Sequence, residues 1–350
     1  MGAYPLHQAM KNISLILLIG CTIPLKGLSN NSDSASFYFQ KGIAEKEAKR
    51  FLPASRAFDK AVTFDPTMVS AYLENAVVSM EMRRIHQAME LYKKVHQLDP
   101  QNKKAIEALM ELNYNYRNYR EAIRFAELCK GCEQSDKIVG MSLYQLEDYP
   151  AAEKKLQEAS RKFEQDAEIF YTLGKNYLDM EEYAKAIPYY EKAVIIDPTK
   201  GRWMYELGLI CYNQSKYQEA VAAFDKAAAA GYTQSSDFKE NLGFAAIYAG
   251  YDERGEALLL ELQSKKPGNT EITRSLAEIY YQQRKYDKSL KMCQLLMEKN
   301  PDDSKALYQA GLNFIKKGDK DRGQQMCDKA IEKDPSLASL RKKKEMPGGL

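Results

Sequence analysis

The sequence has few of the residues on which enzyme and metal chemistry depend. Its 350 residues include only three His and one Trp, and its net charge at pH 7 is +3. A charge this close to zero argues against a dedicated nucleic-acid binder. His7, His86 and His96 are not spaced as metal ligands, and neither a glycine-rich phosphate loop nor a nucleophile elbow occurs. We therefore expect no catalytic residue, no metal and no cofactor.

Long apolar runs are also missing. The run over residues 13–20 is far shorter than the roughly 18 to 20 apolar residues that cross a bilayer. The chain is 45% hydrophobic and 28% charged, which is ordinary for a folded soluble protein. This composition excludes wholesale disorder, a collagen-like rod and a protein with several membrane spans, and we expect no transmembrane span.

The first 29 residues are typical of an export signal. The apolar run over residues 13–20 precedes Gly27 and Ser29, whose small side chains suit cleavage before residue 30. The segment therefore predicts an exported protein, periplasmic or associated with the outer membrane if the source is bacterial.

Two other interpretations of the N-terminus stay open. Residues 18–21, Leu-Ile-Gly-Cys, resemble a bacterial lipoprotein signal, in which Cys21 would be lipidated and would attach the chain to a membrane. Alternatively, the apolar segment is never processed. Met10 also competes with Met1 as the true start, because MKNISLILL is an ordinary opening for a signal.

A period of about 34 residues dominates the rest of the chain. Prolines recur at intervals close to multiples of 34, at Pro66, Pro100, Pro198, Pro267, Pro301 and Pro335. Small residues recur in phase with them, at Gly42, Ala76, Gly140, Gly174, Gly208, Gly243, Ala277 and Gly311. A third series consists of Ala54, Ala88, Ala122, Ala152, Ala186 and Ala220. Large side chains follow this third series by four places, at Phe58, Tyr92, Leu156, Tyr190 and Phe224.

A 34-residue unit with this pattern resembles the tetratricopeptide repeat, a helix-turn-helix module. The resemblance implies an all-α fold, a right-handed superhelical solenoid of helix pairs in which each pair is stabilised by its neighbours. Nine copies are predicted to begin at Ala35, Val69, Lys103, Glu133, Ala167, Gly201, Ser236, Thr270 and Ser304. The predicted organisation is a signal over 1–29, a short linker over 30–34, the repeats over 35–335, and a capping helix and tail over 336–350.

The resemblance also implies that the first helix of each pair lines a concave groove. The residues we expect there are Tyr144, Tyr171, Lys175, Tyr205, Leu209, Tyr212, Phe244, Tyr281 and Tyr308. Tyrosine offers a large contact area with few rotamers and a hydroxyl for hydrogen bonding, which suits a bound peptide. The alternative for each tyrosine is that it only packs against the next repeat.

The motif Cys129-Lys130-Gly131-Cys132 falls at the predicted end of a helix in the shortened third copy. The helix dipole at that end disfavours a reactive thiolate, and zinc would need two further ligands. Inert thiols are the simplest interpretation, and a local disulfide or a metal or redox site are the alternatives. Three other cysteines, Cys211, Cys293 and Cys327, fall at core positions of the repeat.

These patterns predict a scaffold without enzymatic activity that binds a peptide or a partner protein in its groove. Two alternatives stay open: a solenoid that binds carbohydrate or cell wall through aromatic residues, and a thiol-redox protein that uses Cys129 and Cys132. The sequence indicates neither the partner nor the oligomeric state.

Overall fold

The computed structural model describes residues 26–266 and 268–340, and side chains from residue 31 onward. Residues 1–25 of the predicted signal over 1–29, which include the candidate lipidation site Cys21, lie outside the described residues, as does the tail over 341–350. The described part of the chain is built from α-helices and one short 3₁₀ helix, with no strand. The predicted all-α fold is confirmed.

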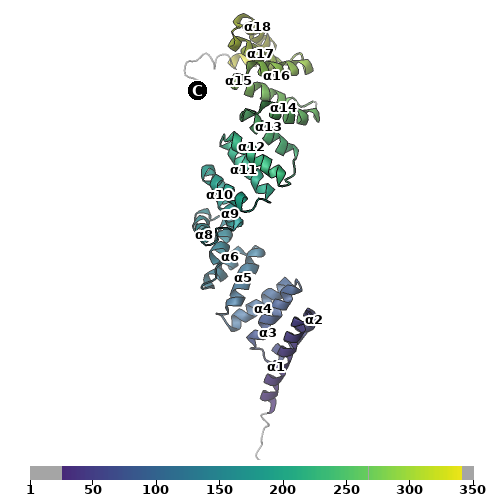
Figure 1. Cartoon of the computed structure of the whole chain (residues 1–350), viewed down its shortest axis with the longest axis vertical. Helices are drawn as coiled ribbons and strands as arrows, with labels where there is room; N and C mark the ends of the chain where they lie inside the picture. Colours follow the sequence, from purple (N-terminus) through teal and green to yellow (C-terminus); the bar gives the residue numbers. More distant parts are fainter. Residues whose placement is uncertain (1–25, 267, 341–350) are drawn as a thin grey trace, which may run out of the picture. The chain divides into compact units, whose positions relative to one another are not determined.

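The helices form consecutive antiparallel pairs, and Figure 1 labels most of these helices. The chain divides into two units, one up to Ser142 and one from Leu143, and the boundary lies inside α7. The first unit holds α1 (Lys26–Glu47), α2 (Phe51–Phe64), α3 (Val69–Glu81), α4 (Ile85–Leu98), α5 (Lys103–Asn115), α6 (Tyr119–Leu128) and most of α7 (Ser135–Gln145).

The second unit continues with the same alternation of first and second helices. It holds α8 (Tyr149–Lys162), α9 (Ala167–Asp179), α10 (Tyr183–Ile196), α11 (Gly201–Asn213), α12 (Tyr217–Ala229), α13 (Ser236–Tyr248), α14 (Asp252–Ser264), α15 (Glu271–Gln282), α16 (Tyr286–Lys299), α17 (Ser304–Lys317), α18 (Lys320–Lys333) and the 3₁₀ helix η1 (Pro335–Leu337).

The repeat pattern locates the start of several first helices to the residue. Six first helices begin where the sequence places the start of a copy, at Val69, Lys103, Ala167, Gly201, Ser236 and Ser304. Second helices end at Asp-Pro dipeptides because the residue before proline is pushed out of the helical region. Their C-caps are Asp65, Asp99, Asp197 and Asp334.

The two ends of the array differ from the sequence prediction. Residues 30–34, expected to form a short linker, belong to α1, which already begins at Lys26. This stretch has no proline, so the polar residues NNSDS continue the helix rather than end it. At the other end, the segment predicted as a capping helix buries Leu337 against the last repeat, whereas Leu340 is 47% exposed.

Glycine lets the two helices of a pair come close together. A Cβ added at Gly174 of α9 would lie 2.5 Å from the Tyr190 ring of α10, and one at Gly208 of α11 would lie 2.5 Å from the Phe224 ring of α12. Both rings are fully buried. The small residue of the first helix therefore makes room for the large residue of the second helix, sixteen places later.

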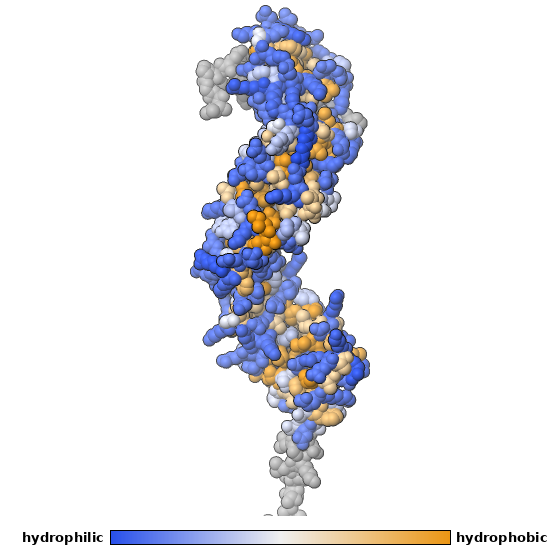
Figure 2. Space-filling view, in the orientation of Figure 1, coloured by the Kyte–Doolittle hydropathy of each residue, from blue (hydrophilic) through white to orange (hydrophobic). Residues whose placement is uncertain are grey.

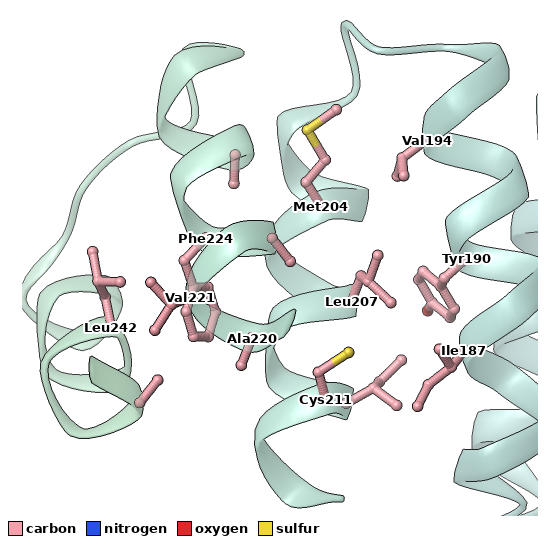
Figure 3. Packing of buried hydrophobic residues seen from close by; sticks show 14 of the residues in the cluster. Ile187, Tyr190, Val194, Met204, Leu207, Cys211, Ala220, Val221, Phe224 and Leu242 are labelled. Carbon is pink, nitrogen blue, oxygen red and sulfur yellow. The ribbon is translucent and has the colours of Figure 1, made fainter. Parts of the chain in front are cut away.

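Successive pairs share one continuous core in the second unit. Figure 3 shows Ile187, Tyr190 and Val194 of α10 facing Met204, Leu207 and Cys211 of α11, with Phe224 on the far side. Since neither pair can cover its own apolar face, each copy depends on its neighbour for stability.

Candidate partner-binding face

Tyrosines on the first helices connect one repeat to the next. The Tyr171 hydroxyl in α9 donates a hydrogen bond to the Glu206 carboxylate in α11, over 2.9 Å. The hydroxyl of Tyr190 donates to the same carboxylate oxygen over 3.2 Å. Burial, followed by the charge of Glu206, raises the pKa of both tyrosines well above its usual value. Both groups therefore remain hydrogen-bond donors at neutral pH.

The same connection recurs one copy earlier. Tyr144 in α7 donates from its hydroxyl to Asp179 in α9, over 2.7 Å. Lys175 lies over the rings of Tyr144 and Tyr171, with its ammonium 5.1 and 5.9 Å from the two centroids. Tyr144 is only 8% exposed, so it joins two repeats and offers little surface to a partner.

Tyr205 makes a third connection of this kind, here as an acceptor. Its hydroxyl oxygen accepts a hydrogen bond from the Asn241 amide in α13, over 2.9 Å. Its ring lies parallel to that of Tyr232, with the centroids 4.8 Å apart, and also contacts Phe238. Tyr205 is therefore held by the repeat that follows it.

The remaining predicted groove residues vary in exposure. Tyr212 is partly buried and meets Tyr217 and Tyr248 edge-on. Tyr308 is 5% exposed, which removes it from the surface available to a partner. Leu209, Phe244 and Tyr281 are partly buried. The sequence left open whether these tyrosines line a groove or only pack against the next repeat. Tyr144, Tyr171 and Tyr205 pack against the next repeat.

We call the surface formed by the first helices of the repeats the first-helix face, and a hollow lies on it between α13 and α15. This pocket has a volume of about 510 Å³. Its apolar lining comes from Phe244, Leu262 and Ile272, and its charged lining includes Glu240, Glu278, Lys265, Lys266 and Arg274. The hollow therefore combines an apolar surface with polar groups, as ligand-binding pockets commonly do.

Gln263 fixes the turn that forms one wall of this hollow. It lies near the end of α14 and is 9% exposed. Its side-chain oxygen accepts hydrogen bonds from the backbone N–H and the hydroxyl of Thr273, at 3.0 and 2.6 Å. Arg274 is also held in place, because its guanidinium pairs with both carboxylate oxygens of Asp303, at 3.3 and 2.6 Å.

An exposed apolar residue marks a second hollow in the same unit. Ile195 near the end of α10 is 76% exposed and lines a pocket of about 260 Å³ with Val194 and Met204. Figure 2 shows such apolar patches within a surface that is otherwise mainly hydrophilic. This hollow is the second candidate for a partner surface.

The pair Cys129 and Cys132 is joined in a disulfide, rather than left as the inert thiols that the sequence favoured. Cys129 caps α6, so the expected position at a helix C-terminus is correct. A carboxylate oxygen of Glu107 in α5 lies within 4.8 Å of both sulfur atoms. Sequence analysis missed Glu107, because nothing in its spacing connects it to the two cysteines.

The cysteines at core positions are buried as predicted. Cys211, Cys293 and Cys327 are each no more than 2% exposed. Burial raises the pKa of the Cys211 thiol to about 11 and that of Cys293 to about 12. Both residues act as small apolar side chains of the core.

Comparison with known proteins agrees with the fold and the repeat. The tetratricopeptide repeat family matches residues 140–200, 171–234 and 305–336. The chain is a tetratricopeptide repeat protein. No helix among its described residues is long and apolar enough to span a bilayer.

Known proteins are similar to it over part of its length. The type IV pilus assembly protein PilF of Pseudomonas aeruginosa is 23% identical over 270 residues, which cover 75% of this chain and 94% of PilF. The protein O-mannosyl-transferase TMTC1 of Homo sapiens is 30% identical over 166 residues, 47% of this chain and 17% of TMTC1. The chain thus spans only a small part of that transferase.

The C-terminal part of a TPR repeat-containing protein from Cytophaga hutchinsonii matches with a TM-score of 0.48 and 16% identity, covering 68% of this chain and 98% of that one.

Proposed function

We propose that this protein is a scaffold without enzymatic activity that binds an extended segment of a partner protein on its first-helix face. The observation that carries the proposal is the hollow of about 510 Å³ between α13 and α15. PilF is by its name an assembly protein, which supports a role in protein interaction.

The lining of the hollow is better suited to binding a peptide than to catalysis. Phe244 and Ile272 supply apolar contact area for one side chain of a bound segment. Glu240 and Lys266 stand on the same lining and can pair with charges of either sign on that segment. Binding at this hollow should therefore weaken moderately as salt is added.

Carbohydrate binding is the alternative, and the aromatic residues support it less well. Trp203 would be the natural platform for a sugar ring, and it lines a pocket of about 720 Å³ near Asp197. Its indole already lies parallel to the ring of Tyr171, with the centroids 4.3 Å apart. The Lys200 ammonium also lies 5.5 Å from its centroid, so little of the aromatic face is left for a sugar.

We propose further that the chain is exported. The run over residues 13–20 with small residues at Gly27 and Ser29 supports cleavage, and Cys21 supports a lipid anchor. A disulfide between Cys129 and Cys132 agrees with an oxidising compartment. Mass analysis of the natural product should find a chain that begins near residue 30 or at a lipidated Cys21. An intact Met1 or Met10 terminus in the cytosol would overturn the export proposal.

Site-specific photo-cross-linking tests the binding face. A photoreactive residue at Glu240, exposed at the hollow, should capture one protein partner in cells of the native host. The matched control is Ala257, which is exposed on α14 and is not among the lining residues. A third position, Ile195, reports on the second hollow.

The cross-linked segment of the partner is then made as a synthetic peptide, and its affinity is measured. Glu240→Lys should change that affinity about ten-fold, and its salt dependence with it. Addition of soluble glycans should leave the complex intact. Equal capture from Ala257, or capture from Ile195 alone, would place the partner elsewhere and overturn the proposed face.

A further inference from the structure

The turn between α6 and α7 is short and tightly wound. It belongs to the shortened third copy and contains Cys129-Lys130-Gly131-Cys132. Gly131 has φ +74°, a conformation that glycine adopts without strain. The backbone N–H of Cys132 donates to the carbonyl of Cys129 over 3.3 Å. The turn thus brings the two cysteines together, with their Cα atoms 5.5 Å apart.

A third group that can bind a metal approaches from α5. The ligand atoms of Glu107, Cys129 and Cys132 all lie within 4.8 Å of one another. Cys129 and Cys132 are 5% and 8% exposed, and Glu107 is partly buried. A carboxylate adds nothing to a disulfide and repels a pair of thiolates. It is, however, a normal zinc ligand beside two thiolates.

We propose that the reduced form of this turn is a zinc site, with Cys129 Sγ, Cys132 Sγ and the Glu107 carboxylate as its three protein ligands. The fourth position of the tetrahedron would be taken by water, as in zinc sites with an open coordination position. A cavity of about 360 Å³, which Glu111 also lines, leads to Glu107 and Cys132 and gives zinc an entry path.

Lys103 balances the charge of the proposed site. Two thiolates and one carboxylate carry three negative charges, and Zn²⁺ leaves one of these unbalanced. The Lys103 ammonium lies 3.7 Å from the Glu107 carboxylate and donates to the carbonyl of Gly131 over 3.3 Å. It can therefore stay beside the complex as its counter-ion and keep Glu107 next to the turn.

The disulfide and the zinc complex exclude each other. A dithiol reductant that donates two electrons and two protons breaks the S–S bond and leaves two thiols, while the reductant itself becomes a disulfide. Zinc then displaces one proton from each thiol and forms two Zn–S bonds. An oxidant that accepts two electrons from the bound thiolates restores the S–S bond and releases the metal.

The other cysteines of the described residues do not compete for zinc. Cys211 and Cys293 are buried, and their raised pKa values keep them protonated at neutral pH. They also belong to different repeats, so no two of them come together as Cys129 and Cys132 do. The proposal is independent of the partner-binding function proposed above.

Metal titration of the full chain tests the proposal. Every sample carries Cys21→Ser, so that this residue adds no thiol. The protein is reduced with a phosphine, freed of excess reductant under anaerobic conditions, and titrated with zinc in competition with a chromogenic chelator. Cobalt is titrated separately, because thiolate ligands produce a charge-transfer band in its spectrum. Circular dichroism checks that each variant keeps its helicity.

We expect the reduced chain to bind one zinc ion and the reoxidised chain to bind none. Cys129→Ser with Cys132→Ser should abolish both zinc binding and the cobalt–thiolate band. Glu107→Gln should keep the band but weaken binding by about ten-fold or more, since even groups outside the ligand set cost about that much. Glu111→Gln, on the same helix and in the same cavity, is the control and should change affinity less than about two-fold.

Two results would overturn the proposal. One is zinc affinity that is equal in the reduced chain and the double serine variant. The other is a cobalt complex without the thiolate band. Unchanged affinity in a folded Glu107→Gln variant would remove Glu107 from the ligand set and with it the proposed site.

Discussion

The hydroxyl of Tyr171 donates to the carboxylate of Glu206 over 2.9 Å, across the junction between two consecutive repeats. The two residues are 35 places apart, almost one repeat period. Tyr144 repeats this bond with Asp179 at the same separation. Polar residues of the first-helix face therefore help to hold the stack together, and mutations there will affect stability as well as binding.

Tyr171→Phe should lower stability without unfolding the protein. It removes one hydrogen bond to a charged acceptor, with an expected loss of about 1.5 to 3 kcal/mol. Glu206 keeps Tyr190 and Arg202 as hydrogen-bonding partners, so its carboxylate remains paired. We therefore expect a loss of stability at the lower end of that range. Urea unfolding measures the loss. Tyr251→Phe, at an exposed position, is the control and should change the free energy of unfolding by less than about 0.5 kcal/mol.

Gly174→Leu should separate the two helices of its pair. A Cβ at this position would already lie 2.5 Å from the Tyr190 ring, which is buried and cannot move aside. Overpacking of this kind costs about 1 to 3 kcal/mol or more. Gly268→Leu adds the same side chain to open space and is the control. Hydrogen exchange should speed up in α9 to α12 more than in α17 and α18; slower or unchanged exchange in α9 to α12 would contradict the packing.

High pH should destabilise the second unit through its buried tyrosines. Burial raises the pKa of Tyr212 to about 12 in the folded chain, against 10.0 for an unperturbed tyrosine. The unfolded chain releases protons first, so this contribution to stability is full below pH 10 and is lost as the pH rises toward 12. Ultraviolet titration should show late-ionising tyrosines in native protein that titrate near pH 10 in urea. Tyr212→Phe should remove one of them.

Reaction with a thiol reagent should distinguish the buried core cysteines from the disulfide-bonded pair. In folded, unreduced protein with Cys21→Ser, a thiol reagent at pH 8 should modify Cys211 and Cys293 very slowly, because both are buried and protonated. Denaturant should expose them at once, whereas Cys129 and Cys132 should react only after reduction. Rapid labelling of Cys129 in unreduced protein would show that no disulfide forms.

The sequence predicted the packing within a pair better than the surface. The 34-residue period locates Gly174 opposite Tyr190, because both belong to in-phase series that any helix pair must bring together. The period could not show whether the Tyr144 side chain points into a groove or toward the next repeat, because both directions start from the same face of the helix. Only the contacts of Tyr144 with Asp179 and Lys175 fix the position of its ring.

Two features of the candidate sites could not be predicted at all. The hollow between α13 and α15 is closed in part by Gln263 and the residues of a turn, which follow no helical period. Glu107 meets Cys129 and Cys132 only because a shortened copy folds its final turn back toward its own first helix. Both depend on the path of loops, where the repeat pattern gives no constraint.

Asp252 connects the seventh and eighth repeats through two lysines. Its carboxylate accepts hydrogen bonds at 2.8 Å from Lys285 and Lys288, and it is 7% exposed. Burial alone would raise the pKa of Asp252, but the two lysines hold it below the usual 3.8. Because the pKa is lower in the folded chain, the contribution to stability is present above about pH 4 and is lost as the pH falls through the lowered value.

Asp252→Asn should therefore destabilise α13 to α16 at neutral pH and do so much less at acidic pH. The expected loss is about 1 to 3 kcal/mol, less than for a fully buried pair, because the lysines are 35% exposed and can be rehydrated. Asp237→Asn is the matched control, since Asp237 also lies in the first turn of its helix but is exposed. Hydrogen exchange of α14 and α16 at pH 7 and pH 3 gives the measurement. An equal loss in both variants would mean that the helix dipole, rather than the two lysines, accounts for the contribution of Asp252.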